Sequence, residues 1–490
     1  MAITQIDELT IMTLLTRGSP KLAAIAAVLL PSSAAAFGGR CHSLHVSASV
    51  RTLSVLRVRG GSSSSSTDHP YLPISLPDTF EERQEDVHVA LLSVLHASRV
   101  TRHLQPIGSS DIQTLSKKDA SPVTVGDFAS QAVALHTIHN TFANSDMYIA
   151  EEGSDALRND EDLLEKVWSA VNHVHKGDLN SKQNLLKAID YGQGIGEEYQ
   201  PSLSKRRVWA LDPIDGTKGF LRGRELGGQY CIALALIEDG EVQVSCLGCP
   251  NLPLPSTEST KVIPYGAWSE NEVKDDTSNS SNGLFSSSRG CLFVAVRGGG
   301  CYEIPLHILE QCLLGHTAAE NSIADLPWKR LHVTANDGTA KLKHEATFCL
   351  GVERGFSDPK GTVLEIARVI HGPDALIVDD DGITDIKNSL RLDGQGKYGL
   401  LARGDAEYFL RLPKDGYVDW VWDVAAGFLC LNEAGGKMSD VNGNAIDFSD
   451  IGKGRKAKLP DHVKGIFGSN GGTFHDALVR AYAEVNGSDD

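Results

Sequence analysis

The sequence predicts an α/β protein of 490 residues, in which two regions of mixed helices and strands follow an N-terminal leader. Three observations predict this fold class. Apolar residues recur at helical spacing from Thr79 to about His103. Short apolar runs of strand composition, such as 292–298, are bounded by turn residues. After Arg330, strand-like runs alternate with helical stretches, which is the pattern of an α/β domain.

The first 70 residues have the composition of a targeting sequence. No acidic residue occurs between Glu8 and Asp68. Lys21 precedes the apolar run 22–30, which is too short to span a bilayer and is followed by small residues up to Ala36. Arginines among serines follow, as in transit peptides. Together these features resemble the bipartite plastid presequences of algae with complex plastids; a mitochondrial presequence and a disordered leader are the alternatives.

The overall composition excludes some partners. The 46 basic and 63 acidic residues give a formal net charge of −17, which argues against a nucleic-acid polymer as partner. The nine cysteines and 17 histidines show no zinc-type spacing, and we expect no disulfide framework. Cys246 and Cys249 have the spacing of a redox motif, but their strand context favours packing residues. We expect a monomer that, once mature, has no membrane segment.

Beyond the leader, we expect an α+β domain over 71–330 and an α/β domain over 331–490. The first domain should carry insertions at 253–290 and 301–328, where composition is polar or irregular. Its expected elements are a helix over 79–103, an extended piece over 123–126, a helix starting at Asp127, and strands at 147–150, 207–211, 230–236, 242–247 and 292–298. Those of the second domain are strands at 331–333, 375–378 and 408–411 and a last helix over 473–485.

The chain is organised around the stretch Leu211–Phe220. We expect the preceding strand to end at Asp212-Pro213, because proline favours an extended conformation in the residue before it. Asp212 and Asp215 can then converge on one small volume, where repulsion and burial would raise at least one pKa. A hard divalent cation such as Mg²⁺ removes that conflict. The following Gly216-Thr217 predicts a helix start, whose free N–H groups favour an anion. The pattern indicates phosphate chemistry; an Asp-Pro turn before a helix is the structural alternative.

This stretch, with D-P-I-D-G-T at 212–217, resembles the signature of the inositol monophosphatase superfamily, the lithium-sensitive, Mg²⁺-dependent phosphatases. Its continuation 218–223 resembles the branch that hydrolyses 3′(2′),5′-bisphosphate nucleotides. W-D-V-A-A-G at 422–427 resembles the second signature of the family. The resemblance covers roughly 75–485 and implies a layered α/β/α/β/α sandwich of the inositol monophosphatase and sugar phosphatase type, with the site between the two domains.

The resemblance implies a set of metal ligands for two or three Mg²⁺ ions. The set comprises Glu151, Asp212, the carbonyl of Ile214, Asp215 and Asp423. Glu151 ends a predicted strand and is favoured as ligand over Glu152. Glu152 and Asp119 are expected to support the ligands without binding the metal themselves. Read alone, Glu151 could equally be part of a solvated turn, and Asp423 a helix cap.

Catalysis is expected from Asp127 and Thr217. In the family an acid after P-V-T hydrogen-bonds the D-G-T threonine, and Asp127 and Thr217 match these positions. The pair would orient and deprotonate a water activated by the metal, which attacks phosphorus in line without a covalent phosphoenzyme. Alone, Asp127 would read as a helix N-cap, and both roles can coexist.

Substrate binding is expected mainly from the second domain. The expected residues are Gly216, Thr217, Phe356, Gly394, Lys397 and Arg411. Two of them depart from the nucleotidases, which commonly carry histidine at the position of Phe356 and serine at that of Gly394. The chemical step should survive both changes. Stacking of Phe356 on adenine, or preference for another bisphosphate, are the two alternatives.

The implied reaction is hydrolysis of the 3′-phosphate of adenosine 3′,5′-bisphosphate to AMP and phosphate. The resemblance also implies that the sulfated form of this nucleotide is a second substrate and that lithium is an inhibitor. It implies a role in sulfur metabolism. Inositol polyphosphate 1-phosphatase shares the core, but 218–220 and Lys397-Tyr398 argue against it. A silent nucleotide-binding or redox-sensing protein usually lacks a metal ligand or the activating acid, and this chain has all of them.

Overall fold

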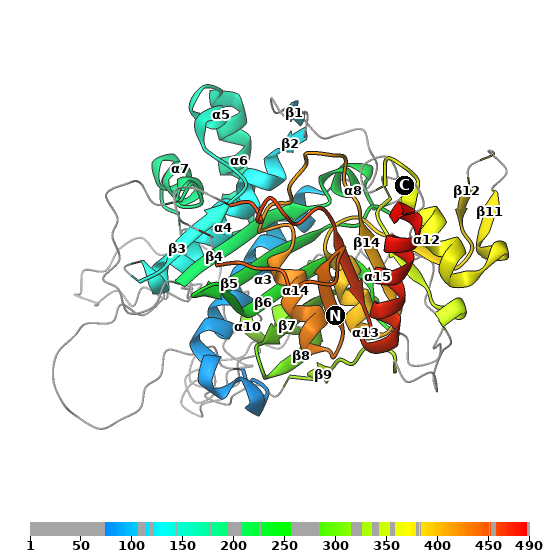
Figure 1. Cartoon of the computed structure of the whole chain (residues 1–490). Helices are drawn as coiled ribbons and strands as arrows, with labels where there is room; N and C mark the ends of the chain where they lie inside the picture. Colours follow the sequence, from blue (N-terminus) through cyan, green and yellow to red (C-terminus); the bar gives the residue numbers. More distant parts are fainter. Residues whose placement is uncertain are drawn as a thin grey trace, which may run out of the picture. The chain divides into compact units, whose positions relative to one another are not determined.

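A computed structural model of the chain describes the residues that form the folded part. These are residues 74–105, 114–116, 122–143, 145–175, 179–194, 207–224, 227–255, 284–285, 287–314, 326–335, 343–352, 358–378, 382, 384–449, 451 and 457–487. They all belong to one compact unit, Thr52–Asp490 (Figure 1). Among them, no helix combines the length and the apolar character that a membrane crossing requires. The expected leader over 1–70, Asp119 and Phe356 lie outside the described residues.

Fourteen helical elements occur among these residues. They are the 3₁₀ helices η1 (Asp78–Arg83), η2 (Lys343–Glu345) and η3 (Pro373–Ala375), and α3 (Gln84–Leu104), α4 (Val125–Phe142), α5 (Asp155–Arg158), α6 (Glu161–Val174), α7 (Lys182–Asp190), α8 (Thr217–Arg222), α10 (Leu306–Leu314), α12 (Thr362–His371), α13 (Gly396–Arg403), α14 (Ala425–Glu433) and α15 (Gly472–Gly487).

Two larger sheets carry most of the strands. The seven-stranded sheet has the order β3-β4-β5-β6-β7-β8-β9, and only its β3–β4 pair is parallel. Its strands are β3 (Met147–Ala150), β4 (Arg207–Asp215), β5 (Cys231–Glu238), β6 (Glu241–Pro253), β7 (Arg289–Val296), β8 (Gly300–Pro305) and β9 (Lys329–Arg330). The five-stranded sheet, β13-β10-β14-β16-β15, comprises β10 (Phe348–Leu350), β13 (Ser389–Arg391), β14 (Tyr408–Arg411), β15 (Lys437–Asp440) and β16 (Ile466–Ser469).

Two short hairpins complete the described strands. They are β1 (Thr114–Ser116) with β2 (Pro122–Thr124), and β11 (Leu376–Val378) with β12 (Thr384–Ile386).

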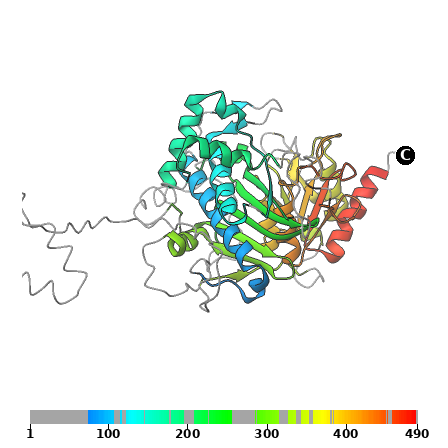
Figure 2. The ribbon, with the colours of Figure 1, turned by 90° about the vertical axis from the view of Figure 1, so that its left-hand side faces the viewer.

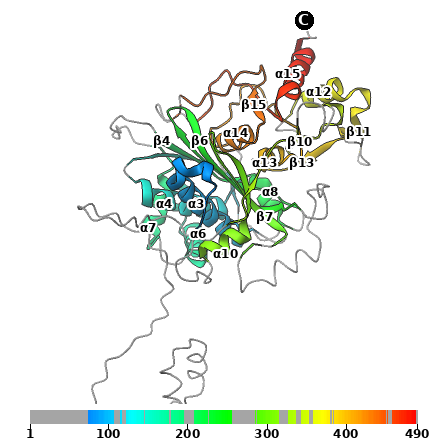
Figure 3. The ribbon, with the colours of Figure 1, turned by 90° about the horizontal axis from the view of Figure 1, so that it is seen from below.

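The elements stack in five layers. Helices α3 and α4 contact one face of the seven-stranded sheet, and α14 and α13 contact its opposite side (Figures 2 and 3). Helices α13 and α14 also contact β10, β14 and β15 of the second sheet, whose outer layer includes α12 and α15. Three hydrophobic clusters fill the spaces between successive layers. This is the α/β/α/β/α sandwich that the sequence predicted.

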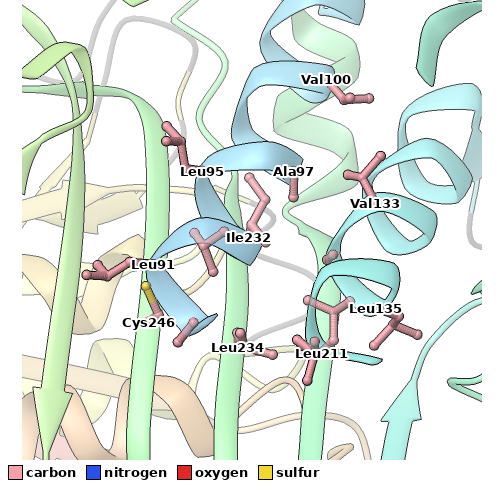
Figure 4. Packing of buried hydrophobic residues seen from close by; sticks show 14 of the residues in the cluster. Leu91, Leu95, Ala97, Val100, Val133, Leu135, Leu211, Ile232, Leu234 and Cys246 are labelled. Atoms are coloured by element: carbon pink, nitrogen blue, oxygen red, sulfur yellow. The ribbon is translucent and has the colours of Figure 1, made fainter. Parts of the chain in front are cut away.

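The first cluster shows how sequence periodicity becomes packing. The apolar residues of α3 predicted to face the core are all fully buried: Val87, Ala90, Leu91, Val94 and Leu95. In Figure 4, the residues of α3 lie over those of β5 and β6, and residues of α4 lie beside them. Removing this apolar surface from water stabilises the packing of α3 and α4 on the sheet by about 25 cal/mol per Å² of buried apolar area.

Several predicted boundaries were wrong within the first sheet. Strand β4 runs through Pro213 to Asp215, because its pairing with β5 is irregular between Asp212 and Asp215. A proline that need not donate to a ladder is tolerated there. Strand β6 runs from Glu241 to Pro253, well beyond the predicted range 242–247. The first part of the supposed insertion 301–328 is β8, which pairs with β7, followed by α10.

The other corrections concern strand and helix starts. Residues 331–333 form no strand; instead 329–330 form β9 at the edge of the first sheet. The strand expected at 375–378 is β11, which pairs only with β12. Helix α4 begins at Val125, so Asp127 lies in its first turn and the extended piece ends at Thr124. The strands at 147–150 and 408–411 have the predicted bounds.

Candidate active site

The two aspartates of the central motif lie at the end of β4. Asp212 pairs with Ala233 of β5, and Asp215 pairs with Cys231 after the irregularity. The Pro213 carbonyl between them accepts a hydrogen bond of 2.7 Å from Ser130 Oγ of α4. The Ile214 N–H donates to Asp212 Oδ1 at 3.1 Å. These contacts hold the turn of the strand that carries both carboxylates.

Helix α8 starts directly after this strand. Gly216 precedes it with φ of +93°, a left-handed conformation that suits glycine. Thr217 is the first helical residue, and its Oγ1 donates to the Ile214 carbonyl at 3.2 Å. The predicted helix start at Gly216-Thr217 is therefore confirmed.

Glu151 reaches the same end of the sheet from the neighbouring strand. It follows β3, which runs parallel to β4 with Ala150 opposite Leu211. Because this parallel pairing continues to Ala150 and Leu211, Glu151 lies beside Asp212, the residue that follows Leu211 in β4. The next residue, Glu152, is clamped by its backbone: Gln131 Nε2 donates to its carbonyl at 2.7 Å, and its N–H donates to Gln131 Oε1 at 2.9 Å.

Asp423 approaches from the turn before α14. Its N–H donates to the Trp420 carbonyl at 3.1 Å, and α14 begins two residues later, so Asp423 lies just before the helix. Arg411, the last residue of β14, lies 3.5 Å from Asp423 Oδ2 through one terminal guanidinium nitrogen. Its Nε donates to Asp419 Oδ1 at 2.6 Å. Asp419 thus orients Arg411 beside Asp423.

The carboxylates of this site interact electrostatically. Burial raises the pKa of Asp212 well above its ordinary value, and the charges of Asp215, Glu151 and Asp423 raise it further. The pKa of Asp423 is raised mainly by burial, which Arg411 opposes. The charges of Glu151, Asp215 and Asp423 therefore lie close enough to Asp212 to act on its carboxylate.

The segment after β13 packs directly on the central motif. Gly394 has φ of +71°, and a Cβ there would lie 2.4 Å from the Asp215 carbonyl oxygen. The side-chain amide and backbone N–H of Gln395 donate to the Asp215 carboxylate, whose pKa burial nevertheless raises. Gln395 also donates to the Trp422 carbonyl at 2.7 Å and accepts from the Gly427 N–H at 3.1 Å. Gln395 therefore links the Asp215 carboxylate to the Asp423 turn.

The ammonium group of Lys397 is held by backbone carbonyls and is not solvated like a surface lysine. Its ammonium donates to the carbonyls of Gly394 and Leu392 at 2.6 and 3.2 Å. Together with Arg411 it lowers the pKa of Asp215, opposing the effect of burial. Lys397 therefore lies next to the carboxylate cluster and contributes positive charge to it.

The expected catalytic pair comes from neighbouring elements. Asp127 is 2% exposed and lies in the first turn of α4. Strand β2, which runs directly into α4, contacts α8, whose first residue is Thr217. The hydrogen bond between Asp127 and Thr217 stays a prediction.

The donor set suits a hard divalent cation in chemical terms, because carboxylate and carbonyl oxygens are the ligands that Mg²⁺ and similar ions take. Among the residues that the structure describes, no three His, Cys, Asp or Glu side chains are placed so that they could bind one metal ion together. The assignment of Glu151, Asp212, Ile214, Asp215 and Asp423 as ligands accordingly stays a prediction.

Three supporting residues were not found by sequence reasoning. Gln131 holds the backbone after Glu151, Gln395 holds Asp215, and Asp419 holds Arg411. The only local signals are that Gln395 stands between two glycines and that Asp419 lies four residues before Asp423. Neither signal specifies a partner, because Asp215 and Trp422 are far from Gln395 in the chain and Arg411 is brought to Asp419 only by the fold.

One family model matches most of the chain. The model of the inositol monophosphatase family matches residues 119–485. A 3′(2′),5′-bisphosphate nucleotidase of Emericella nidulans is 36% identical over 383 residues, covering 76% of this chain and 91% of that protein. A 3′(2′),5′-bisphosphate nucleotidase 2 of Candida albicans is 34% identical, covering 82% and 97%. A solved structure of extragenic suppressor protein suhB from Bartonella henselae aligns with a TM-score of 0.45 at 16% identity, covering 81% of this chain and 98% of that one.

Proposed function

The chain belongs to the inositol monophosphatase family, and we propose that it is a Mg²⁺-dependent phosphatase that hydrolyses the 3′-phosphate of adenosine 3′,5′-bisphosphate to AMP and phosphate. The observation that carries the substrate is the similarity to 3′(2′),5′-bisphosphate nucleotidases, which extends over 91% and 97% of their lengths. The sulfated form of the same nucleotide is the second proposed substrate.

The metal side of the site is assigned to the carboxylate cluster. Glu151, Asp212, the Ile214 carbonyl, Asp215 and Asp423 would hold the two or three Mg²⁺ ions. When bound, the ions would supply Lewis-acid activation of water and would neutralise charge on the phosphoryl group. Gln395 and the clamp of Gln131 on Glu152 keep the carboxylates in place through hydrogen bonds. This support matters because misplacement of a reacting group by about 1 Å can cost a factor of roughly 100 in rate.

The proton-transfer side is assigned to Asp127 and Thr217. The buried Asp127 carboxylate would accept a proton relayed from water through the Thr217 hydroxyl. The hydrogen bond from Thr217 Oγ1 to the Ile214 carbonyl, a predicted metal ligand, supports this assignment.

The substrate side is assigned to the neighbouring cations and backbone. Arg411, held by Asp419, would bind a phosphate oxygen of the nucleotide, and Lys397 would add positive charge behind it. The N–H groups of Gly216 and Thr217 would contact the scissile phosphate, and Gly394 would let the ribose approach closely.

A panel of phosphate-release assays tests the proposal against its rivals. Adenosine 3′,5′-bisphosphate, inositol 1,4-bisphosphate and inositol monophosphate would each be offered with Mg²⁺, with and without lithium. We expect release from the nucleotide, with inhibition by lithium. Faster release from inositol 1,4-bisphosphate would instead identify an inositol polyphosphate 1-phosphatase, and no release from any substrate a silent homologue.

The cellular setting is a separate proposal. From the composition of 1–70 we propose plastid targeting, with a mitochondrial destination as the alternative. From the proposed substrate we propose a role of the mature enzyme, as a monomer, in sulfur metabolism. Fusion of 1–70 to a fluorescent protein in an alga with complex plastids tests the destination; fluorescence outside the plastid would contradict it.

A further inference from the structure

A pocket lies directly beside the arginine of the candidate active site. It has a volume of about 340 Å³, and its wall begins at Leu412, the residue after Arg411. Tyr417 belongs to the same wall and hydrogen-bonds Arg411. Tyr482 of α15 and the chain before α12 close the other sides. The pocket therefore adjoins the site on the side of the second sheet.

The pocket offers positive charge to an anion. Lys414 and Lys464 line it and are exposed, and no partner for either is found among the described residues. The third lysine, Lys360, is neutralised by Asp415, with Nζ to carboxylate oxygen distances of 2.9 and 3.0 Å. Two unpaired ammonium groups at one small cavity attract a dianion such as phosphate.

The pocket also offers contacts to a nucleoside. Tyr482 and Tyr417 supply aromatic rings. Asp358 uses Oδ2 to accept from the Val363 N–H at 3.0 Å, while its buried Oδ1 has no hydrogen-bond partner among the described residues. A buried acceptor without a partner is costly, and a donor on a ligand, such as an amino or hydroxyl group, would satisfy it.

A larger pocket of about 560 Å³ lacks these features. It is lined by Arg83, Asp86 and Arg207, among others. These charges are already paired: Arg207 contacts Asp86 at 2.6 Å, and Arg83 contacts Glu238 at 2.7 Å. It leaves no unpaired cation for a phosphate.

We propose that the pocket beside Arg411 binds the end of the substrate that is not cleaved, with Lys414 and Lys464 receiving its 5′-phosphate. The inference rests on the proposed function, because it assigns the second phosphate of the same nucleotide. It also explains how the chain would distinguish a nucleoside bisphosphate from a monophosphate without a 5′-phosphate: the discriminating charges lie outside the carboxylate cluster.

Equilibrium binding of AMP and of adenosine to the full chain tests the pocket without turnover. For the double variant Lys414→Ala/Lys464→Ala, we expect AMP binding to weaken by roughly tenfold, the size expected for two exposed ion contacts, and adenosine binding to change by less than about twofold. The AMP effect should shrink as salt is raised. Lys414→Arg/Lys464→Arg should restore AMP binding, and Lys437→Ala, an exposed lysine on β15, should leave it unchanged.

Two outcomes would overturn the inference: unchanged AMP affinity in the double alanine variant, or an equal loss for AMP and adenosine. Phosphate release from adenosine 3′,5′-bisphosphate by the wild-type chain, measured on the same preparation, separates this failure from that of the proposed function. Release with unchanged AMP binding overturns the pocket alone. Absence of release with the expected loss of AMP binding overturns the proposed reaction and keeps the pocket.

Discussion

Replacing Gly394 by alanine should disable the site through the backbone of Asp215. Gly394 has φ of +71°, which costs an L-residue about 1–2 kcal/mol. In addition, the new Cβ would lie 2.4 Å from the Asp215 carbonyl oxygen, whereas real Cβ atoms essentially never approach below 3.0 Å. The two chain segments must therefore separate by at least about half an ångström, and the carboxylate of Asp215 must move with its backbone.

A matched control isolates the contribution of the contact. Gly298 has φ of +74°, close to that of Gly394, but a Cβ there would meet nothing within 4 Å. Gly298→Ala should therefore lose only the conformational term of about 1–2 kcal/mol and keep its activity. Gly394→Ala should lose about 1–3 kcal/mol more, as overpacked sites do, and phosphate release should fall by roughly 100-fold because a predicted metal ligand is misplaced.

Thermal unfolding and phosphate-release kinetics on both variants provide the measurement. The reasoning is refuted if Gly394→Ala matches Gly298→Ala in both stability and rate. The result also bears on the departure from the nucleotidases at this position, because a serine carries the same Cβ and is expected to be equally disruptive in this chain.

Three further predictions concern chemistry, metal and pH. Asp127→Asn should lower phosphate release by about 10²–10⁴-fold with an unchanged unfolding temperature, and near-normal turnover would contradict its assignment as proton acceptor. Chelation should abolish phosphate release and added Mg²⁺ should restore it while raising the unfolding temperature; full activity in excess chelator would exclude the metal role. Burial lowers the pKa of His88, His175 and His475 to about 4 in the folded chain, below the ordinary value of 6.5. Between these values the unfolded chain binds more protons at these three sites, so their contribution to the free energy of unfolding should fall as pH drops from about 6.5 to 4, against the opposite contribution of the buried aspartates; histidine-to-glutamine variants with an unchanged pH profile would contradict this.

The sequence predicted the elements whose local pattern and final environment agree. The helical face of α3 and the strand 147–150 were predicted because a buried stripe and a buried run leave direct traces in the order of apolar residues. Strand β8 was missed because its six residues gain strand structure from pairing with β7, a contact that local composition does not encode. The strand was predicted to end at Asp212-Pro213 because a proline usually interrupts strand pairing. Here the pairing of β4 with β5 is irregular between Asp212 and Asp215, and the strand continues past the proline.

In the candidate site, too, some residues leave a signal in the sequence and others do not. The acids could be predicted because strand ends and family motifs mark Glu151, Asp212 and Asp423 in the sequence. The residues that hold them could not, because a glutamine such as Gln395 acquires its role only through partners that are 180 residues before it or 27 residues after it.

The hydrogen bonds of Gln395 with Asp215 and with the turn that carries Asp423 have a consequence for how the protein folds while it is synthesised. The first sheet can be complete once β9 has been synthesised, yet Asp215 then lacks the amide of Gln395 and the guanidinium of Arg411, which come later in the chain. A nascent or truncated chain that ends before Arg411 would thus carry a concentrated, uncompensated negative patch. Competence should appear abruptly, when the last segments dock, rather than accumulate with chain length.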